Sequence, residues 1–123
     1  MIFGLSFLEN VVTLQHKHTT MKLTNVFVHQ VYFWLKDEAD QPKLIEGLQT
    51  LANIGGVQYM HIGVVAGTPK DVVDNTYHAS LLTVFDNQEA QDTYQVHPIH
   101  EKFIAEYVKP LIAKVVVMDS VDA

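Results

Sequence analysis

The sequence predicts one α+β domain in which four strands and two helical regions follow in the order strand, helix, strand, strand, helix, strand. Three observations predict this fold class. Runs rich in valine and aromatic residues alternate with a period of two, as strands do. Apolar residues elsewhere recur at helical spacing. Turn-forming glycine, proline and Asp-Asn residues separate these runs. A length of 123 residues is sufficient for one domain with a hydrophobic core.

Composition excludes several classes of partner. The chain has 8 lysines, no arginine and 14 carboxylates, for a net charge of -6. Because phosphate-binding proteins usually display clustered arginine and lysine, nucleic acids, nucleotides and anionic membranes are poor candidate partners. The absence of cysteine excludes a disulfide, a thiolate nucleophile and a zinc-thiolate site. No apolar run approaches the ~20 residues of a membrane span, so we expect a soluble, cytoplasmic protein.

The first twenty residues differ from the rest, and we divide the chain into an N-terminal extension, residues 1–20, and a domain, residues 21–123. Residues 2–8 are apolar, but no basic residue precedes them and no small-residue cleavage site follows, which argues against a secretory signal. Two interpretations stay open. Met21 is the true start, or the extension is an arm that pairs with a partner subunit.

The first strand is expected over residues 25–35, and both of its faces are largely apolar. A strand of this kind needs cover on both sides: helices over one face and a second subunit over the other. One face carries Phe27, His29, Val31, Phe33 and Leu35, and the other carries Val28, Gln30, Tyr32 and Trp34.

The first helix is expected to follow a polar turn, with Pro42 in its first turn. An apolar stripe at helical spacing then predicts one buried face. Gly55-Gly56 is expected to end the helix in a left-handed cap. The stripe consists of Leu44, Ile45, Leu48, Leu51 and Ala52.

Two further strands are expected at residues 57–66 and 76–85, joined by a polar loop. Asp86, followed three residues later by Glu89, predicts an N-cap with its capping-box partner. A short helical piece then runs to Tyr94.

The second helical region resumes at Pro98, which is suited to a first helical turn. Ile99, Phe103 and Tyr107 then share one helix face. Lys109-Pro110 is expected to close the helix, and residues 111–118 form a fourth, valine-rich strand.

This element order is that of the ferredoxin-like split βαβ fold, a four-stranded antiparallel sheet with helices on one face. The bare face would carry Tyr32 and Trp34 in an apolar patch too large for a monomer. We therefore predict a homodimer, a dimeric α/β barrel.

Candidate chemistry gathers between Tyr94 and His100, where one phenol and two imidazoles surround Pro98. These side chains are suited to moving protons near neutral pH. The helix starting at Pro98 would place His100 against an apolar layer. From spacing alone, a simpler interpretation is favoured: His97 caps the helix and His100 is a half-buried packing residue.

No metal site and no cofactor is predicted. His97 and His100 stand three residues apart, and Glu101, His78 or His61 would have to join them. No spacing among these residues matches a zinc signature.

The combined pattern resembles the Dabb family, the stress-responsive dimeric α/β-barrel domain. The residues that carry the resemblance lie between about 22 and 120: His29-x-Val31-x-Phe33, the strand leading into Asp86 and Glu89, Tyr94-x-x-His97-Pro98-x-His100-x-x-Phe103, and a final valine strand ending in Asp119. The resemblance implies a ferredoxin-like subunit whose sheet pairs with a second sheet to form a barrel.

The resemblance also implies site residues. In the family's plant polyketide cyclase, which forms olivetolic acid, a tyrosine and a histidine drive an aldol-type ring closure. Motif matching places the histidine at His100, the tyrosine at Tyr94 and a first-strand pocket histidine at His29. A further pocket histidine falls on Ala79 here, and the neighbouring His78 is expected to point the other way.

Three functional hypotheses follow. In the first, His100 is a general base and Tyr94 orients it or donates to an oxyanion, on a small, apolar, carbonyl-bearing substrate. In the second, the buried polar groups satisfy one another in a non-catalytic stress protein or carrier. The third, a monooxygenase-like barrel, rests on fold analogy. The residues expected to contact substrate are His29, Val31, Phe33, His97 and Phe103.

Overall fold

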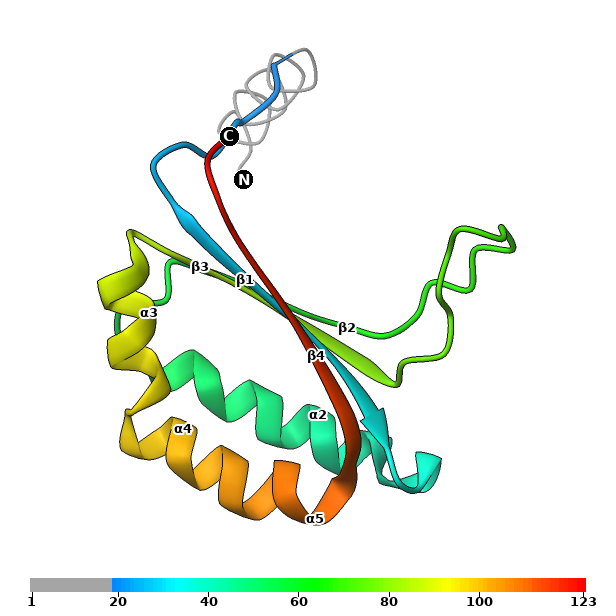
Figure 1. The fold of residues 1–123 in the computed structure, drawn as a ribbon. Helices are drawn as coiled ribbons and strands as arrows, with labels where there is room; N and C mark the ends of the chain where they lie inside the picture. The colour runs from blue at the N-terminus through cyan, green and yellow to red at the C-terminus, as the bar shows by residue number, and fades with distance from the viewer. Residues whose placement is uncertain (1–18) are drawn as a thin grey trace, which may run out of the picture.

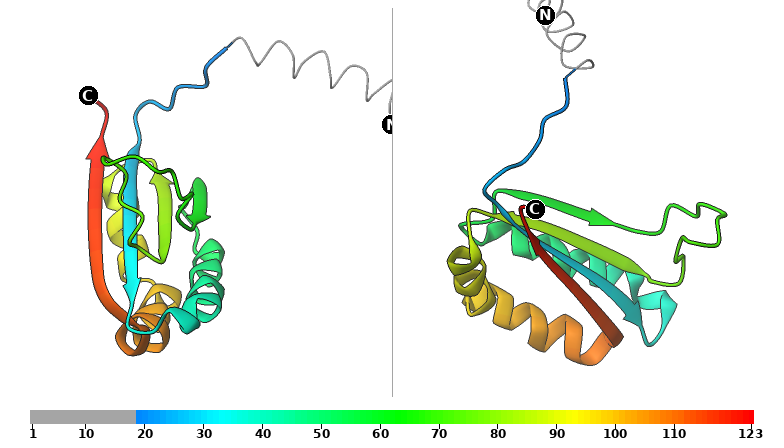
Figure 2. Two further views of the ribbon diagram at one scale, coloured as in Figure 1. Left: turned by 90° about the vertical axis from the view of Figure 1, so that its right-hand side faces the viewer. Right: turned by 45° about the horizontal axis from the view of Figure 1, so that its top comes forward.

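The computed structural model describes residues 19–123, and its four strands form one antiparallel sheet in the order β2-β3-β1-β4. The helices cover one face of this sheet (Figures 1 and 2). The predicted element order and the ferredoxin-like α+β fold are confirmed. The strands are β1 (Phe27–Leu35), β2 (Tyr59–Gly63), β3 (Ala79–Phe85) and β4 (Ile112–Val121).

Within residues 19–123 the helical layer consists of three principal helices and four short helical turns. The principal helices are α2 (Gln41–Thr50), α3 (Gln88–Gln95) and α4 (Pro98–Phe103). No helix within residues 19–123 is long and apolar enough to cross a membrane. Both interpretations of the N-terminal extension depend on residues 1–18, which lie outside the described part of the chain. The short turns are η1 (Glu38–Asp40), η2 (Leu51–Asn53), the π-helical η3 (Ile104–Val108) and α5 (Lys109–Leu111).

The termini of the sheet differ from the expected boundaries for physical reasons. β1 begins at Phe27 because Asn25 adopts a left-handed conformation, with φ of 57°. The carboxylate of Asp122 accepts hydrogen bonds from the Asn25 and Val26 amides, at 2.6 and 3.3 Å. β4 therefore continues past Met118 to Val121, opposite Phe27.

Two caps differ in outcome. The prediction that Asp86 caps the helix is wrong by one residue, because Asn87 Oδ1 accepts from the Ala90 amide at 2.9 Å. The Asp86 carboxylate instead accepts from the Gln58 side-chain amide. Gly56 is left-handed as predicted, with φ of 91°, although α2 itself ends at Thr50 and only η2 continues toward that glycine.

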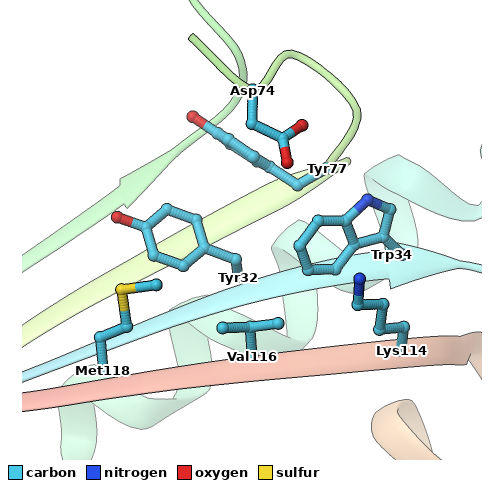
Figure 3. Close-up of a pocket in the computed structure, with 7 residues that line it drawn as sticks. All are labelled: Tyr32, Trp34, Asp74, Tyr77, Lys114, Val116 and Met118. Carbon is cyan, nitrogen blue, oxygen red and sulfur yellow. The ribbon is translucent and has the colours of Figure 1, made fainter. Parts of the chain in front are cut away.

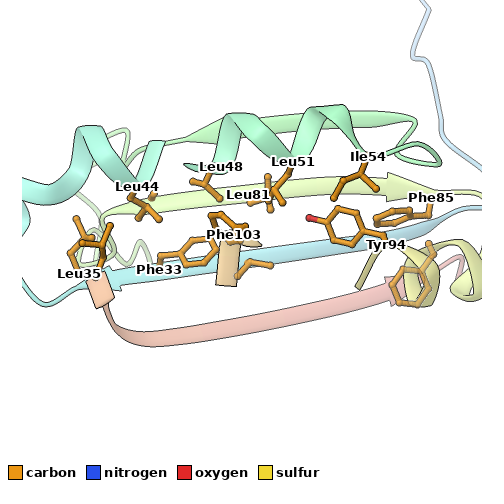
Figure 4. Close-up of a cluster of buried hydrophobic side chains, with 14 residues drawn as sticks. Phe33, Leu35, Leu44, Leu48, Leu51, Ile54, Leu81, Phe85, Tyr94 and Phe103 are labelled. Atoms are coloured by element: carbon orange, nitrogen blue, oxygen red, sulfur yellow. The ribbon is translucent and has the colours of Figure 1, made fainter. Parts of the chain in front are cut away.

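The core fills the space between the sheet and α2 (Figure 4). Leu44, Leu48 and Leu51 are fully buried and pack with the core residues Phe33 and Phe103. Each buried leucine contributes about 1.5–3 kcal/mol relative to an exposed one. This layer is therefore the main source of stability and fixes the helices that carry the site.

The helices approach closely at Gly47. A Cβ added there would overlap the ring of Tyr107, which stacks on Phe103 with ring centroids 6.0 Å apart. The Tyr107 hydroxyl donates to Glu46 Oε2 at 3.0 Å. At the end of η3 the Lys109 amide donates to the carbonyl of Ile104, five residues earlier. The helix ends at Leu111, one residue beyond the expected end at Pro110.

Candidate functional site

A cavity of about 120 Å³ lies between the helix-covered face of the sheet and the helices. Its walls are mainly apolar, and its polar groups come from three elements: β1, α3 and α4. The lining residues are His29, Val31, Phe33, Leu51, Leu81, Tyr94, Gln95, His100, Phe103, Ile104, Val108, Val115 and Val117.

His29 lies on the helix-covered face of β1 and is buried. Its Nδ1 is 2.6 Å from Asp119 Oδ1 of β4, the residue directly opposite it in the antiparallel register. Since a carboxylate only accepts, Nδ1 carries the proton in this pair. Asp119 thereby fixes the ring and leaves Nε2 available for other partners.

Tyr94 comes from the last turn of α3 and is only 1% exposed. Its hydroxyl has no hydrogen-bond partner among the described residues. A buried donor without a partner costs about 1–3 kcal/mol. Burial also raises the pKa of Tyr94, so the phenol stays protonated and keeps a donor free.

His100 lies in α4 and packs edge-to-face on Tyr94, with ring centroids 4.9 Å apart. Burial is the main cause that lowers the pKa of His100, and neighbouring His29 lowers it further, whereas Glu101 raises it. The imidazole is therefore neutral at pH 7 and able to accept a proton. The second hypothesis has the buried polar groups satisfy one another, but the Tyr94 hydroxyl has no hydrogen bond to His100 or to any other described residue.

The other expected contact residues separate into two groups. Val31, Phe33 and Phe103 line the cavity together with His29. His97 does not line it, because its Nδ1 accepts from the Ile99 amide at 3.0 Å and caps α4. The predicted cap is confirmed, and the structure places His97 at the helix terminus instead of in the cavity.

Sequence reasoning missed Asp119 and Gln95 as site residues. Gln95 Oε1 accepts from Gln91 Nε2 at 3.0 Å, beside the cavity. Asp119 ended the motif that carries the family resemblance, but its contact with His29 depends on the register between strands 90 residues apart in sequence. The alternation of side chains along the last strand assigns Asp119 to the face of His29 only after the register between the two strands is known.

The remaining histidines in the described domain lie elsewhere. His78 Nδ1 accepts from the Leu35 amide at 2.9 Å, outside the cavity lining, and Ala79 is fully buried in the core. His61 pairs with Leu82, on the face away from the helices. Residues 19–123 hold no group of three or more side chains arranged for a metal ion.

The second face of the sheet, turned away from the helices, is called the open face below. It carries a groove of about 410 Å³, larger in volume than the cavity. Figure 3 shows the side chains that line this groove. Lys114 Nζ lies 4.6 Å from the centre of the Trp34 ring, and Trp34 Nε1 donates to Thr76 Oγ1 at 2.9 Å. Among residues 19–123, the histidines at hand for proton transfer, His29 and His100, line the cavity and not the groove. The lining residues are Tyr32, Trp34, Asp74, Tyr77, Lys114, Val116 and Met118.

Solved structures with this fold come from bacteria and a plant. A Dabb family protein with a ferredoxin-like fold from Mesorhizobium loti is 24% identical, with 80% of this chain and 97% of that chain covered and a TM-score of 0.65. A dimeric ferredoxin-like protein of unknown function from Thermobifida fusca is 21% identical, with 85% and 97% covered and a TM-score of 0.65. An Arabidopsis thaliana protein is 24% identical, with 79% and 95% covered and a TM-score of 0.66.

These identities show the shared fold, and a search of curated proteins gave no match. The family assignment comes from a different comparison. The family model for the stress responsive A/B barrel domain, Dabb, matches residues 27–122, from the first residue of β1 to just beyond β4. The chain therefore belongs to the Dabb family.

Proposed function

We propose that the chain binds a small, largely apolar, carbonyl-bearing molecule in the cavity and catalyses proton transfer on it, as a polyketide cyclase or lyase does. One observation carries the proposal: the buried Tyr94 hydroxyl has no partner within residues 19–123, and Tyr94 lines a cavity together with His29 and His100. An unsatisfied donor in a core persists at a cost, and a ligand oxygen would remove that cost.

Each residue has a distinct role. Neutral His100 takes a proton from an acidic C–H or O–H of the substrate and returns it to the product. Tyr94 donates a hydrogen bond to the oxyanion that develops on the carbonyl oxygen. His29 presents Nε2 to the substrate, and Asp119 positions the ring through Nδ1. General acid–base catalysis of this kind contributes about 10² to 10⁴ in rate.

The test uses 2,4-pentanedione, a small diketone with an acidic C–H bond, and follows deuterium uptake at its central carbon by NMR. The wild-type chain should accelerate uptake over buffer, and His100→Ala should remove most of that acceleration without unfolding the domain. His97→Asn is the matched control, since it removes an imidazole near His100 but keeps a helix-capping acceptor. Equal rates for wild type and a folded His100→Ala variant would refute the role of His100.

A second candidate function is a non-catalytic dimeric stress protein or carrier. The size of the cavity favours the stress protein over the carrier, because about 120 Å³ is below the ~300–1,000 Å³ of most ligand pockets. In that case 2,4-pentanedione would leave the NMR resonances of His29 and His100 unchanged. A protein from Chloroflexus aurantiacus that carries the name of an antibiotic biosynthesis monooxygenase is 18% identical to this chain, and at that identity the similarity supports a shared fold and not a shared reaction.

We also propose that a second copy covers the open face and completes a barrel. Tyr59 and Met118, which lie on this face, are each 58% exposed, and the Thermobifida fusca protein of the same fold is described as dimeric. Large exposed apolar patches mark interaction surfaces. Light scattering should give the mass of two chains, and a mass of one chain would overturn the dimer.

A further inference from the structure

The loop between β2 and β3, residues 64–78 and here called the β2–β3 loop, leaves the end of the sheet and rises on the side opposite the helices (Figure 1). It contains no helix or strand. Loops of this length without secondary structure are uncommon in compact domains, and many are functional. Its direction places it beside any molecule that is seated on the open face.

The loop is held in shape by its own hydrogen bonds. Asn75 Nδ2 donates to the Thr68 carbonyl at 3.0 Å, and the Val73 amide donates to the Lys70 carbonyl at 3.0 Å. At its base, Thr76 Oγ1 accepts from Trp34 Nε1 at 2.9 Å. The loop is therefore a preformed projection that is fixed to the open face.

The loop presents apolar side chains that the chain itself does not cover. Val72 is 93% exposed, and Val64 at the start of the loop is 53% exposed. A single exposed valine is ordinary on a protein surface. Here the exposed valines belong to a hydrogen-bonded projection that stands next to an apolar sheet face, and this placement points to a covering partner.

The size of the open face points to the same partner. Four strands about 4.8 Å apart and about 23 Å long cover a flat footprint on the order of 400 Å². A standard interface buries about 800 Å² of accessible surface on each partner. Side chains raise the accessible area of the sheet face above its flat footprint, but the face is still small for a stable dimer. A loop that extends beyond the face supplies further contact area.

We propose that the β2–β3 loop is an arm by which each copy of the chain grips the second copy seated on its open face. The inference rests on the dimer proposed above and deepens it. A two-fold axis makes each contact occur twice, so the two arms clasp the pair from opposite ends. Val72 is then buried against the second copy.

The test measures the dimer dissociation constant of the full chain by sedimentation at a series of concentrations. Val72→Asp should raise this constant at least about tenfold, because burial of a valine changes an equilibrium constant by about that factor. Val96→Asp is the matched control: Val96 is 67% exposed but follows α3 in the helical layer. Met118→Asp, on the open face of the edge strand β4, should dissociate the dimer.

The outcomes separate the arm from the dimer. If Met118→Asp dissociates the dimer while Val72→Asp and Val96→Asp have equal dissociation constants, the proposal of the arm is refuted and the dimer is supported. A wild-type chain that sediments as one copy overturns both. Hydrogen exchange adds an independent measurement: amides of residues 64–78 should be protected in the wild-type dimer and lose that protection in Met118→Asp. Equal exchange in the two would count against the arm.

Discussion

The two faces of the sheet differ in how deeply their side chains are buried and in which residues line the hollow on each face. Along β1, residues on the helix-covered face are buried and those on the open face are half-buried, in strict alternation. The helix-covered face has the smaller hollow, yet it holds His29, Tyr94 and His100. The open face has the larger groove, lined by Tyr32, Trp34 and Tyr77 together with Lys114. The larger volume and the buried titratable groups therefore lie on opposite faces of the sheet, and buried groups with shifted pKa values are the stronger indication of a functional site.

The largest expected effect is on the helix-covered face. Leu48→Ala removes a fully buried side chain and should destabilise the domain by about 2–5 kcal/mol. Urea unfolding measures the change. Val96→Ala, at an exposed position, should change the free energy of unfolding by less than about 0.5 kcal/mol. Similar losses in both variants would contradict the difference between core and surface.

The contact between α2 and η3 should give the next largest effect. Gly47→Ala places a Cβ too close to Cγ and Cδ1 of the Tyr107 ring and should destabilise the domain by about 1–3 kcal/mol. Adding Tyr107→Leu should recover part of that loss, because the flat ring is the atom group in the way. A double-mutant cycle in urea measures the coupling. Strictly additive losses would show that the overlap is relieved by another movement.

Tyr94→Phe sharpens the comparison at the site. The variant removes a buried hydroxyl that has no partner among residues 19–123, so we expect stability to rise by about 1–3 kcal/mol. The same variant should lower catalysed deuterium uptake by 2,4-pentanedione, since the oxyanion donor is lost. Thermal unfolding and NMR measure the two effects. A less stable Tyr94→Phe variant would show that the hydroxyl has a partner in solution.

The smallest expected effect is on pH dependence. The pKa of His100 is lowered in the folded chain from its usual 6.5, so the unfolded chain binds more protons between those two pKa values. His100 therefore makes the domain lose stability as pH falls below about 6.5, and the loss grows until pH passes the folded pKa. His100→Gln should unfold with a weaker pH dependence in that window. Identical pH profiles would contradict the buried, neutral imidazole.

Local chemistry explains what could be predicted. The period of two along β1 placed His29 with Val31 and Phe33, and these three residues do line one cavity. Pro98 and the residue before it fixed the start of α4 and the capping role of His97. The same reasoning shifted one cap from Asn87 to Asp86, because the two side chains are both good caps and only the path of the chain distinguishes them.

By itself, then, the sequence determined the order of the elements, the side of β1 that faces the helices and the helix start at Pro98, because side-chain period and proline geometry act over a few residues. Tertiary structure decided the rest. The register of β1 on β4 brought Asp119 to His29. The packing of α3 against α4 set Tyr94 and His100 edge to face and left the phenol without a partner in the described part of the chain. These contacts depend on how whole elements meet, and no local pattern encodes them.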